Sequence, residues 1–401
     1  MVLKENKHYD LIVIGGGIVG LSCAYRYLEL YPEKSILLIE KESDIFAHQS
    51  GRNSGVIHSG IYYQPGSLKA KNCIDGYNKL LKFIEKHNIP FELTGKLIVT
   101  NDINKIDDLT SLKANGEKNG LKGLKLLTPK DILKHEPFCT KAVGALYVPQ
   151  TGIVNYKTVG EKMLSDIQAK GGSIFYNSSV ISIENKTLGA SITLSDNKVL
   201  NGKKVIVATG VNSDMFISKK LKNKYRIFPF KGEYYRLKKT KQNLVKGLIY
   251  PLPDLKFPFL GVHLTKTMKN QVEAGPNAVL SLSRMKYSKL SFNLRDFFMI
   301  IAWKGFWIFA LKYWKVGLFE LVRSYSKNIF IKSLQDLVPM IKNEDIEVAG
   351  SGIRAQILTN EGKLYDDFLI ESDKHITCVV NAPSPAATSS IAIAESIINK
   401  L

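Results

Sequence analysis

The chain opens with apolar runs separated by a helical pattern. Leu11–Ile14 is wholly apolar and is followed at once by glycines, a pattern typical of a buried parallel strand that ends in a tight turn. Residues 21–30, LSCAYRYLEL, predict a helix, and residues 35–39 form a second apolar run that predicts a strand. The order strand, helix, strand indicates an α/β fold.

The later pattern predicts two kinds of region. Between residues 68 and 214, the sequence predicts helices over 68–87 and 154–170, strands over 95–100, 173–184 and 203–214, and a hairpin arm over 192–200. From Tyr225 onward the sequence is aromatic, basic and strand-rich, and its alternating runs predict an antiparallel sheet. The closing residues return to apolar strands and a helix. We therefore expect an α/β, Rossmann-like domain that is discontinuous in sequence, and a second α+β domain.

The first turn carries the spacing G-x-G-x-x-G at Gly15, Gly17 and Gly20. In a dinucleotide site the first glycine allows the sharp turn, the second lets backbone approach a pyrophosphate, and the third lets helix and strand pack closely. The helix that starts near Ile18 would offer free N–H groups and a positive dipole end to the phosphates.

An acid and a long loop follow the second strand. Glu40, with Lys41 beside it, lies about twenty residues beyond the last glycine, where a carboxylate accepts hydrogen bonds from a ribose diol. The next 25 or so residues show little periodicity, and a loop of that length is usually functional. Such a loop favours FAD over NAD, because its polar groups could wrap the phosphates and flavin ring. The loop residues we expect to contact FAD are Ser50, Arg52, Asn53, Ser54 and Gly55.

Composition bounds the class of protein. A chain of 401 residues with 45% hydrophobic content is long enough for about two domains and is not disordered. The net charge of +20 favours anionic partners, but does not choose between nucleic acid, membrane and acidic metabolites. The four cysteines are far apart and form no metal-ligand spacing, so we expect reduced thiols and no metal. The polar start MVLKENKHYD runs directly into a strand, so we expect a cytoplasmic protein without a signal peptide.

Several blocks carry a family resemblance. They are SGRNSGVIHSGIYYQPGSLKAK (50–71), TGKLIV (94–99), FPFKGEYYRL (228–237), GVHLT (261–265), GPNAVLSLSR (275–284), GIRAQ (352–356), GKLYDDFLI (362–370) and NAPSPAATS (381–389). With them the chain resembles flavoproteins of the D-amino-acid oxidase type, and within these the L-2-hydroxyglutarate dehydrogenase/oxidase family. The first block is shared with FAD-dependent glycerol-3-phosphate dehydrogenases, whereas the later blocks are specific to the hydroxyglutarate enzymes.

The resemblance implies an FAD enzyme that oxidises L-2-hydroxyglutarate to 2-oxoglutarate and passes electrons to oxygen or, in bacteria, to membrane quinone. It also implies that Val180, Thr209 and Gly210 lie near the cofactor. The domains expected from pattern and resemblance together are an FAD-binding domain over 1–90, 150–224 and 345–401, and a substrate domain over 91–149 and 225–344.

Oxidation of a hydroxy acid requires a base for the hydroxyl proton and cations for the carboxylates. His58 in the loop and His263 in GVHLT are candidate bases, and the sequence does not decide between them. Arg354 is the first choice for a carboxylate, because a guanidinium fork matches it. Weaker substrate-binding candidates, for which packing in an aromatic sheet is an equal alternative, are Tyr62, Lys231 and Tyr235.

The closing segment NAPSPAATSS has the composition of a helix start. Ser384 is a candidate cap for a helix whose first position is Pro385, and Ala386 and its neighbours allow close approach. With Pro383, these residues are expected to contact the flavin, whose negative charge a helix N-terminus would stabilise. Helix-on-sheet packing is the alternative explanation of the small residues.

Residues 284–332 combine ten Lys and Arg with two acids, and 297–314 read FFMIIAWKGFWIFALKYW. No apolar run there reaches the ~18 residues of a spanning helix. A basic, aromatic helix in a membrane interface and a helix packed in the substrate domain explain the segment equally well. A helix in the membrane interface implies contact with an anionic membrane surface and with its quinone.

Two alternatives to hydroxyglutarate oxidation remain. The runner-up enzyme is a glycerol-3-phosphate dehydrogenase or another 2-hydroxy or amino acid oxidase, because a basic pocket also suits phosphate. A membrane- or nucleic-acid-binding protein with a structural flavin is the alternative of another class. No nucleic-acid-binding motif is visible, so we expect no nucleic acid partner.

Overall fold

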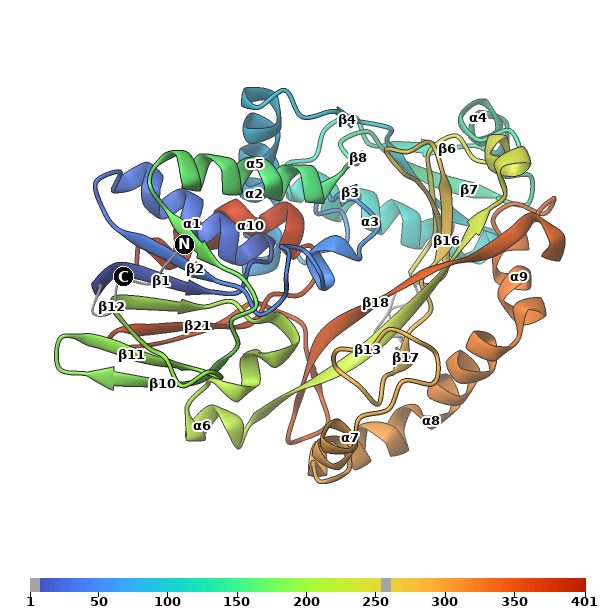
Figure 1. Cartoon of the computed structure of the whole chain (residues 1–401). Helices are drawn as coiled ribbons and strands as arrows, with labels where there is room; N and C mark the ends of the chain where they lie inside the picture. Colours follow the sequence, from blue (N-terminus) through green and yellow to red (C-terminus); the bar gives the residue numbers. More distant parts are fainter. Residues whose placement is uncertain (1–7, 254–260) are drawn as a thin grey trace.

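The computed structural model describes residues 8–253 and 261–401, and these form two halves, each built on a large sheet (Figure 1). The polar start considered above lies mostly in residues 1–7, outside the described residues. The described strands of the first sheet are β10 Val180–Lys186, β11 Gly189–Leu194, β12 Val199–Val207, β1 His8–Ile14, β2 Ile36–Ile39, β9 Ser173–Phe175, β20 Leu369–Asp373 and β21 Ile376–Asn381.

The centre of the first sheet is parallel. Strand β1 pairs in parallel with β2 and β12, and β12 also pairs in parallel with β21. Leu11 and Val13 pack on one face with helical residues, while Ile12 and Ile14 pack on the other face. Burial on both faces explains why this strand is a continuous apolar run. Helices that contribute to the first of these cores are α1 Ile18–Leu30, α2 Leu68–Lys86, α5 Tyr156–Ala169 and α10 Ala386–Ile398.

The second sheet is mainly antiparallel, as the alternating pattern predicted. Its described strands, in spatial order, are β19 Leu364–Tyr365, β18 Ile346–Thr359, β13 Tyr225–Leu237, β16 Val272–Gly275, β15 His263–Lys266, β14 Leu248–Pro251, β5 Lys96–Thr100, β7 Gly144–Val148 and β6 Lys125–Leu127, with β17 Val279–Leu280 paired to β13. The predicted fold class, a Rossmann-like α/β half and an α+β half, is confirmed.

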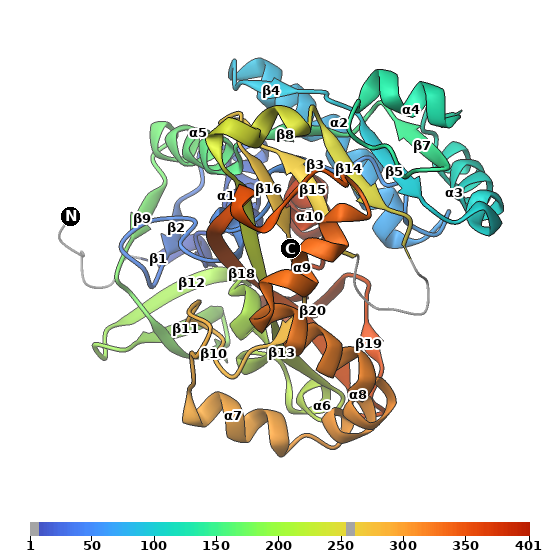
Figure 2. The ribbon, with the colours of Figure 1, turned by 90° about the vertical axis from the view of Figure 1, so that its right-hand side faces the viewer.

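Most of the remaining helices complete the second half, whereas α6 Lys219–Lys222 lies on the first half, where Leu221 packs in the core that holds Ile12 and Ile14; a small sheet lies between the two halves. The helices of the second half are α3 Ile106–Lys118, α4 Pro129–His135, α7 Leu294–Ile301, α8 Lys304–Tyr325 and α9 Lys327–Gln335. The small sheet consists of β3 Val56–Ile57, β8 Gly152–Val154 and β4 Phe91–Glu92. Figure 2, turned by 90° from Figure 1, shows α7 and α8 along the outer edge of the second half, far from α1 and α5.

Several boundaries differ from expectation; the strand predicted over 203–214, for example, is β12 Val199–Val207 followed by a 3₁₀ helix over Gly210–Met215. The strand predicted over 173–184 is divided into β9 and β10, with Asn177 between them at a φ of +52°. The helix predicted from residue 154 begins at Tyr156, because Asn155 caps it by accepting from the Lys157 N–H. The expected return to the first domain at residue 345 comes later, because β18 and β19 still pair within the second sheet.

Candidate functional site

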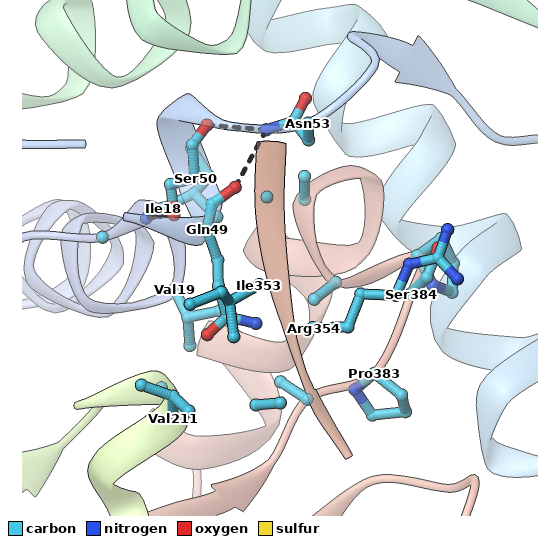
Figure 3. Close-up of a pocket in the computed structure, with 18 of the residues that line it drawn as sticks. Ile18, Val19, Gln49, Ser50, Asn53, Val211, Ile353, Arg354, Pro383 and Ser384 are labelled. Atoms are coloured by element: carbon cyan, nitrogen blue, oxygen red, sulfur yellow. Dashed lines mark hydrogen bonds between the residues drawn. The ribbon is translucent and has the colours of Figure 1, made fainter. Parts of the chain in front are cut away.

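One cavity of about 1180 Å³ runs along the junction of the two halves. Its walls come from the ends of β1 and β2, the loop after β2, the start of α10, and β18 of the second sheet. Figure 3 shows part of it, with Gln49 and Ser50 drawn on one side of β18, Asn53 above the upper end of the strand, and Pro383 and Ser384 on the other side. A cavity of this volume, lined by residues of both halves, can hold a large ligand that contacts both.

The glycine turn forms one end of this cavity. Gly15 has a φ of +110°, and a Cβ atom there would lie 2.4 Å from the Ala208 carbonyl oxygen, so only glycine fits. Gly17 is the N-cap of α1, and the Ile18 N–H donates to Ser50 Oγ at 2.9 Å. Gly15, Gly17 and Ile18 line the cavity. Backbone donors at a helix start can bind phosphate there.

Gly20 acts through packing. It is not among the residues that line the cavity. A Cβ at this position would lie 2.0 Å from the Gly15 carbonyl oxygen, which shows how closely α1 approaches the strand. This is the packing task that the spacing of the motif assigned to its third glycine.

Glu40 ends the second strand at the cavity wall. One carboxylate oxygen accepts the Gly16 N–H at 2.7 Å, and the other accepts the Glu42 N–H at 3.0 Å. Glu40 and Lys41 both line the cavity, and the Lys41 ammonium lies 3.1 Å from the Glu42 carboxylate. The two backbone hydrogen bonds hold the Glu40 carboxylate in place at the wall, where it can accept a hydrogen bond from a hydroxyl of a ligand.

The loop after β2 covers the cavity. Asn53 Nδ2 donates to the Ser50 carbonyl at 2.6 Å and to the Gln49 carbonyl at 3.3 Å (Figure 3). The Arg52 guanidinium lies 3.9 Å from the centre of the Tyr287 ring. Ser50, Arg52, Asn53 and Ser54 line the cavity, and Gly55 does not; its N–H donates to Asn53 Oδ1 at 2.9 Å. The loop folds on itself and leaves its polar groups at the cavity wall.

The other expected cofactor contacts come from distant parts of the chain. Val180, Thr209 and Gly210 line the cavity from the strands that follow α5, and Gly210 has a φ of +57°. From the closing segment the lining residues are Pro383, Ser384, Pro385 and Ala386. Helix α10 begins at Ala386 with Pro385 as its N-cap, and no side chain caps it. The expectation that Ser384 caps a helix starting at Pro385 is therefore wrong, because the chain turns into the helix one residue later.

Both candidate histidines line the cavity. Burial, followed by the charge of Lys96, lowers the pKa of His58 to about 3. Burial likewise lowers the pKa of His263 to about 3, and its ring stacks on Tyr250 with centroids 3.9 Å apart. His263 Nδ1 lies 2.9 Å from the Gly261 carbonyl, which can only accept, so the neutral ring has its lone pair on Nε2. Neutral imidazoles of this kind can accept a proton.

The candidate substrate residues divide into two groups. Arg354 and Tyr62 line the cavity. The Lys231 ammonium instead donates to the carbonyls of Ser288 and Lys289, at 2.9 and 3.1 Å, and is not among the lining residues. Arg354 extends from β18 in Figure 3 and can hold an anionic group in the cavity.

Tyr235 lies on the opposite side of β13 from the cavity. Its ring packs in the core against Phe330, with centroids 4.6 Å apart, whereas Tyr234 lines the cavity. Burial raises the pKa of Tyr234, and the nearby Arg354 charge opposes that rise. Successive residues of a strand point to opposite faces of the sheet, so the prediction of Tyr235 in place of its neighbour Tyr234 selects the face away from the cavity.

Several cavity residues gave no signal in the sequence. Lys105, just before α3, and one face of α3 contribute to the cavity wall; the α3 residues are Asp108, Ser111, Leu112 and Asn115. Tyr63 and Lys69 also line the cavity, and the Lys69 ammonium pairs with Asp366 at 2.8 Å. The α3 residues lie in a weakly patterned, lysine-rich region, and only the three-dimensional fold brings them here. Among the described residues, no group of three His, Cys, Asp or Glu side chains is placed to hold a metal.

Comparison with known proteins gives a consistent result. The family described as FAD dependent oxidoreductase matches residues 10–399. L-2-hydroxyglutarate dehydrogenase of Indibacter alkaliphilus is 46% identical over 387 residues, which is 96% of each chain. The mitochondrial L-2-hydroxyglutarate dehydrogenase of Homo sapiens is 39% identical over 99% of this chain and 89% of its own.

A solved structure shares the fold. L-alpha-glycerophosphate oxidase from Mycoplasma pneumoniae with FAD bound superposes with a TM-score of 0.78 and 20% identity, over 98% of this chain and 94% of its own. At this level of identity the likeness concerns the fold.

The two neighbouring tyrosines provide a test of the site. We expect Tyr235→Ala to lower the free energy of unfolding by about 3 kcal/mol, because it leaves a hole in the core beside Phe330. Tyr234→Ala is expected to lower it by less than about 1 kcal/mol, since that ring borders a cavity. Denaturant unfolding of both variants measures the difference, and the reverse order would contradict this placement.

Proposed function

The chain belongs to the FAD dependent oxidoreductase family, and we propose that it oxidises L-2-hydroxyglutarate to 2-oxoglutarate with FAD as its cofactor. The observation that carries this proposal is the near full-length relationship to L-2-hydroxyglutarate dehydrogenases, at 46% and 39% identity in the two cases above. The cavity supports it, because it brings neutral histidines and an arginine to the same space.

The residues present fit FAD. Gly15 permits the sharp turn, with its φ of +110°, that brings the start of α1 to this end of the cavity, and Glu40 stands where the ribose of an adenosine would lie. The far end of the cavity passes the start of α10 and reaches β18. When bound, FAD supplies the acceptor for the hydride that leaves the α-carbon of the substrate.

The protein contributes binding, orientation and a base. The Arg354 guanidinium is suited to hold a substrate carboxylate by two parallel hydrogen bonds. A neutral imidazole, of His58 or of His263, accepts the proton of the substrate hydroxyl as the hydride leaves, so the alcohol becomes a ketone. The positive end of the α10 dipole, which begins at Ala386 on the cavity wall, stabilises negative charge that develops nearby.

We expect the purified protein to be yellow and to bleach when L-2-hydroxyglutarate is added without oxygen, because the substrate reduces the bound flavin. Absorbance between about 350 and 500 nm, the flavin region, monitors the reaction. D-2-hydroxyglutarate and glycerol 3-phosphate are the controls and should leave the colour unchanged. Bleaching by glycerol 3-phosphate alone would favour the alternative enzyme, and a colourless protein that takes up no FAD would exclude both.

The base can be identified with His58→Asn and His263→Asn. Both variants are expected to keep FAD, and the one that lacks the base should lose about 10²–10⁴-fold in the rate of flavin reduction, which is the usual contribution of general base catalysis. Stopped-flow measurement at saturating substrate separates this loss from weaker binding. Wild-type rates in both variants would contradict a histidine base.

We further propose that the outer helices α7 and α8 dock on an anionic membrane surface, on its cytoplasmic side. Large apolar side chains stand exposed along them, including Phe298 (55% exposed), Trp307 (54%), Leu311 (78%) and Trp314 (58%). Packing in the core explains only part of the segment, since Phe306 and Phe309 do contact the core cluster that includes Phe228 and Trp303.

The charge of the segment supports the same surface. Lys304, Lys312 and Lys315 are exposed on α8 beside these apolar residues, which is the pattern of a helix lying in a membrane interface. No helix in the described part of the chain is both long and apolar enough to cross a bilayer. Docking of this kind would place the enzyme beside a lipid-dissolved quinone, the electron acceptor that we propose.

Liposome flotation tests the membrane proposal. We expect the protein to float with vesicles that contain anionic lipid at moderate salt, and the triple variant Lys304→Glu/Lys312→Glu/Lys315→Glu to remain at the bottom, because each charge near the surface contributes about 1 kcal/mol. The matched control carries the same change at the exposed Lys130, Lys134 and Lys141 and should still float. Equal behaviour of the two triple variants would contradict docking through α8.

A further inference from the structure

Lys96 is a buried lysine beside the cavity. It is the first residue of β5, and its side chain is 1% exposed. The ammonium nitrogen lies 4.4 Å from the centre of the Tyr62 ring and 4.8 Å from that of Tyr250. Both tyrosines line the cavity, and Lys96, which is not itself a lining residue, lies directly behind their rings.

Two polar groups at this wall lack partners. Within residues 8–253 and 261–401, neither Lys96 Nζ nor Tyr62 Oη has a hydrogen-bond partner, although both atoms are buried. A buried ammonium is unfavourable unless an anion compensates it, and the faces of two aromatic rings compensate it only in part. Two adjacent donors without an acceptor indicate that a ligand supplies the acceptor.

The position of Lys96 in the sheet suits a ligand with two negative ends. The strand order is β18, β13, β16, β15, β14, β5, so His263 on β15 stands between Arg354 on one side and Lys96 on the other. After burial and the Gly261 hydrogen bond, the charges of both Arg354 and Lys96 act on the His263 ring. A cation on each side of a candidate base matches a hydroxy acid with a carboxylate at each end.

We propose that Lys96 and the Tyr62 hydroxyl bind the distal carboxylate of the substrate and select dicarboxylates over hydroxy acids with an uncharged tail. Arg354 then holds the carboxylate next to the reacting carbon. This inference rests on the proposed function and names the residues that give it its specificity. A site that leaves charged donors unpaired rejects a substrate without the matching group much more strongly than an apolar pocket would.

Lys96 is also the group here that titrates near neutral pH. Burial lowers its pKa to about 7, partly offset by Cys73 on α2. The groups that face it titrate elsewhere, because burial lowers the pKa of His58 and His263 to about 3 and raises that of Cys73 to about 12. Burial also raises the pKa of Tyr62 and Tyr250 far above neutrality. The preference for a dicarboxylate should therefore weaken as the pH rises through about 7 in the free enzyme.

The experiment compares L-2-hydroxyglutarate with its distal amide, L-2-hydroxyglutaramate, in the FAD-loaded wild type, Lys96→Met and Lys96→Gln. We expect both variants to lose about 10²-fold or more in kcat/KM for the dicarboxylate and less than about threefold for the amide. The pH dependence of the ratio near 7 should vanish with the lysine. Lys327→Met is the matched control, because that ammonium donates to the Ile346 carbonyl at 3.0 Å, and it should keep the wild-type ratio.

Thermal unfolding tests the same site without turnover. Lys96→Met is expected to raise the Tm of the substrate-free holoenzyme, since it removes an uncompensated buried charge, whereas loss of a purely structural residue would lower it. Glutarate should raise the Tm of the wild type more than its monoamide does, and this difference should disappear in both Lys96 variants.

The outcomes separate this inference from the proposed function. A wild-type ratio of the two substrates in the Lys96 variants, or an equal loss for both substrates together with a lower Tm, would overturn the role of Lys96. If L-2-hydroxyglutarate fails to bleach the wild type, the proposed function is wrong. The role of Lys96 is then decided by the larger rise in Tm that glutarate gives over its monoamide. If this difference in Tm persists in the Lys96 variants, the inference is overturned; if it is lost, the inference is supported.

Discussion

The site depends on the antiparallel pairing of β13 with β18. The pairing begins where Tyr225 lies opposite Thr359 and ends where Leu237 lies opposite Ile346, and it crosses the junction of the two halves. At one end, Ile227 and Ile353 pack with residues of the first sheet; at the other, Tyr235 and Ile346 pack in the core of the second. The same ribbon carries Arg354 and Tyr234 to the cavity. The relative position of the two sheets around the cavity is thus set by one long pair of strands.

The cavity wall is mainly apolar and holds a few deeply buried polar groups, and this combination determines its chemistry. Burial keeps both histidines neutral, with a pKa of about 3, and keeps the Tyr62 hydroxyl protonated. In surroundings of low polarity, each hydrogen bond to a ligand is stronger than in water, and each missing one is more costly. Such a site gains much of its stability only when its ligands are bound.

Local sequence signals predicted the cofactor end better than the substrate end. The turn at Gly15 and Gly17 and the acid at Glu40 have fixed spacing along one short stretch, so the sequence reveals them. At the other end, the choice between Tyr234 and Tyr235 depends on register, and Lys96 appears as an ordinary strand residue until its neighbours are known. The cavity face of α3 depends on how a whole helix is placed, which periodicity in a weakly patterned region does not give.

The first sheet has a consequence for how the protein is made. Strand β12 borders β21, and α10 packs between α1 and α2, so the amino-terminal core is completed by a segment that follows the whole second half in the sequence. During synthesis at about 5–20 residues per second, the parallel edge of β12 waits for its partner while the whole second half is still being translated. Nascent chains of this protein therefore expose an unpaired strand edge for tens of seconds or less.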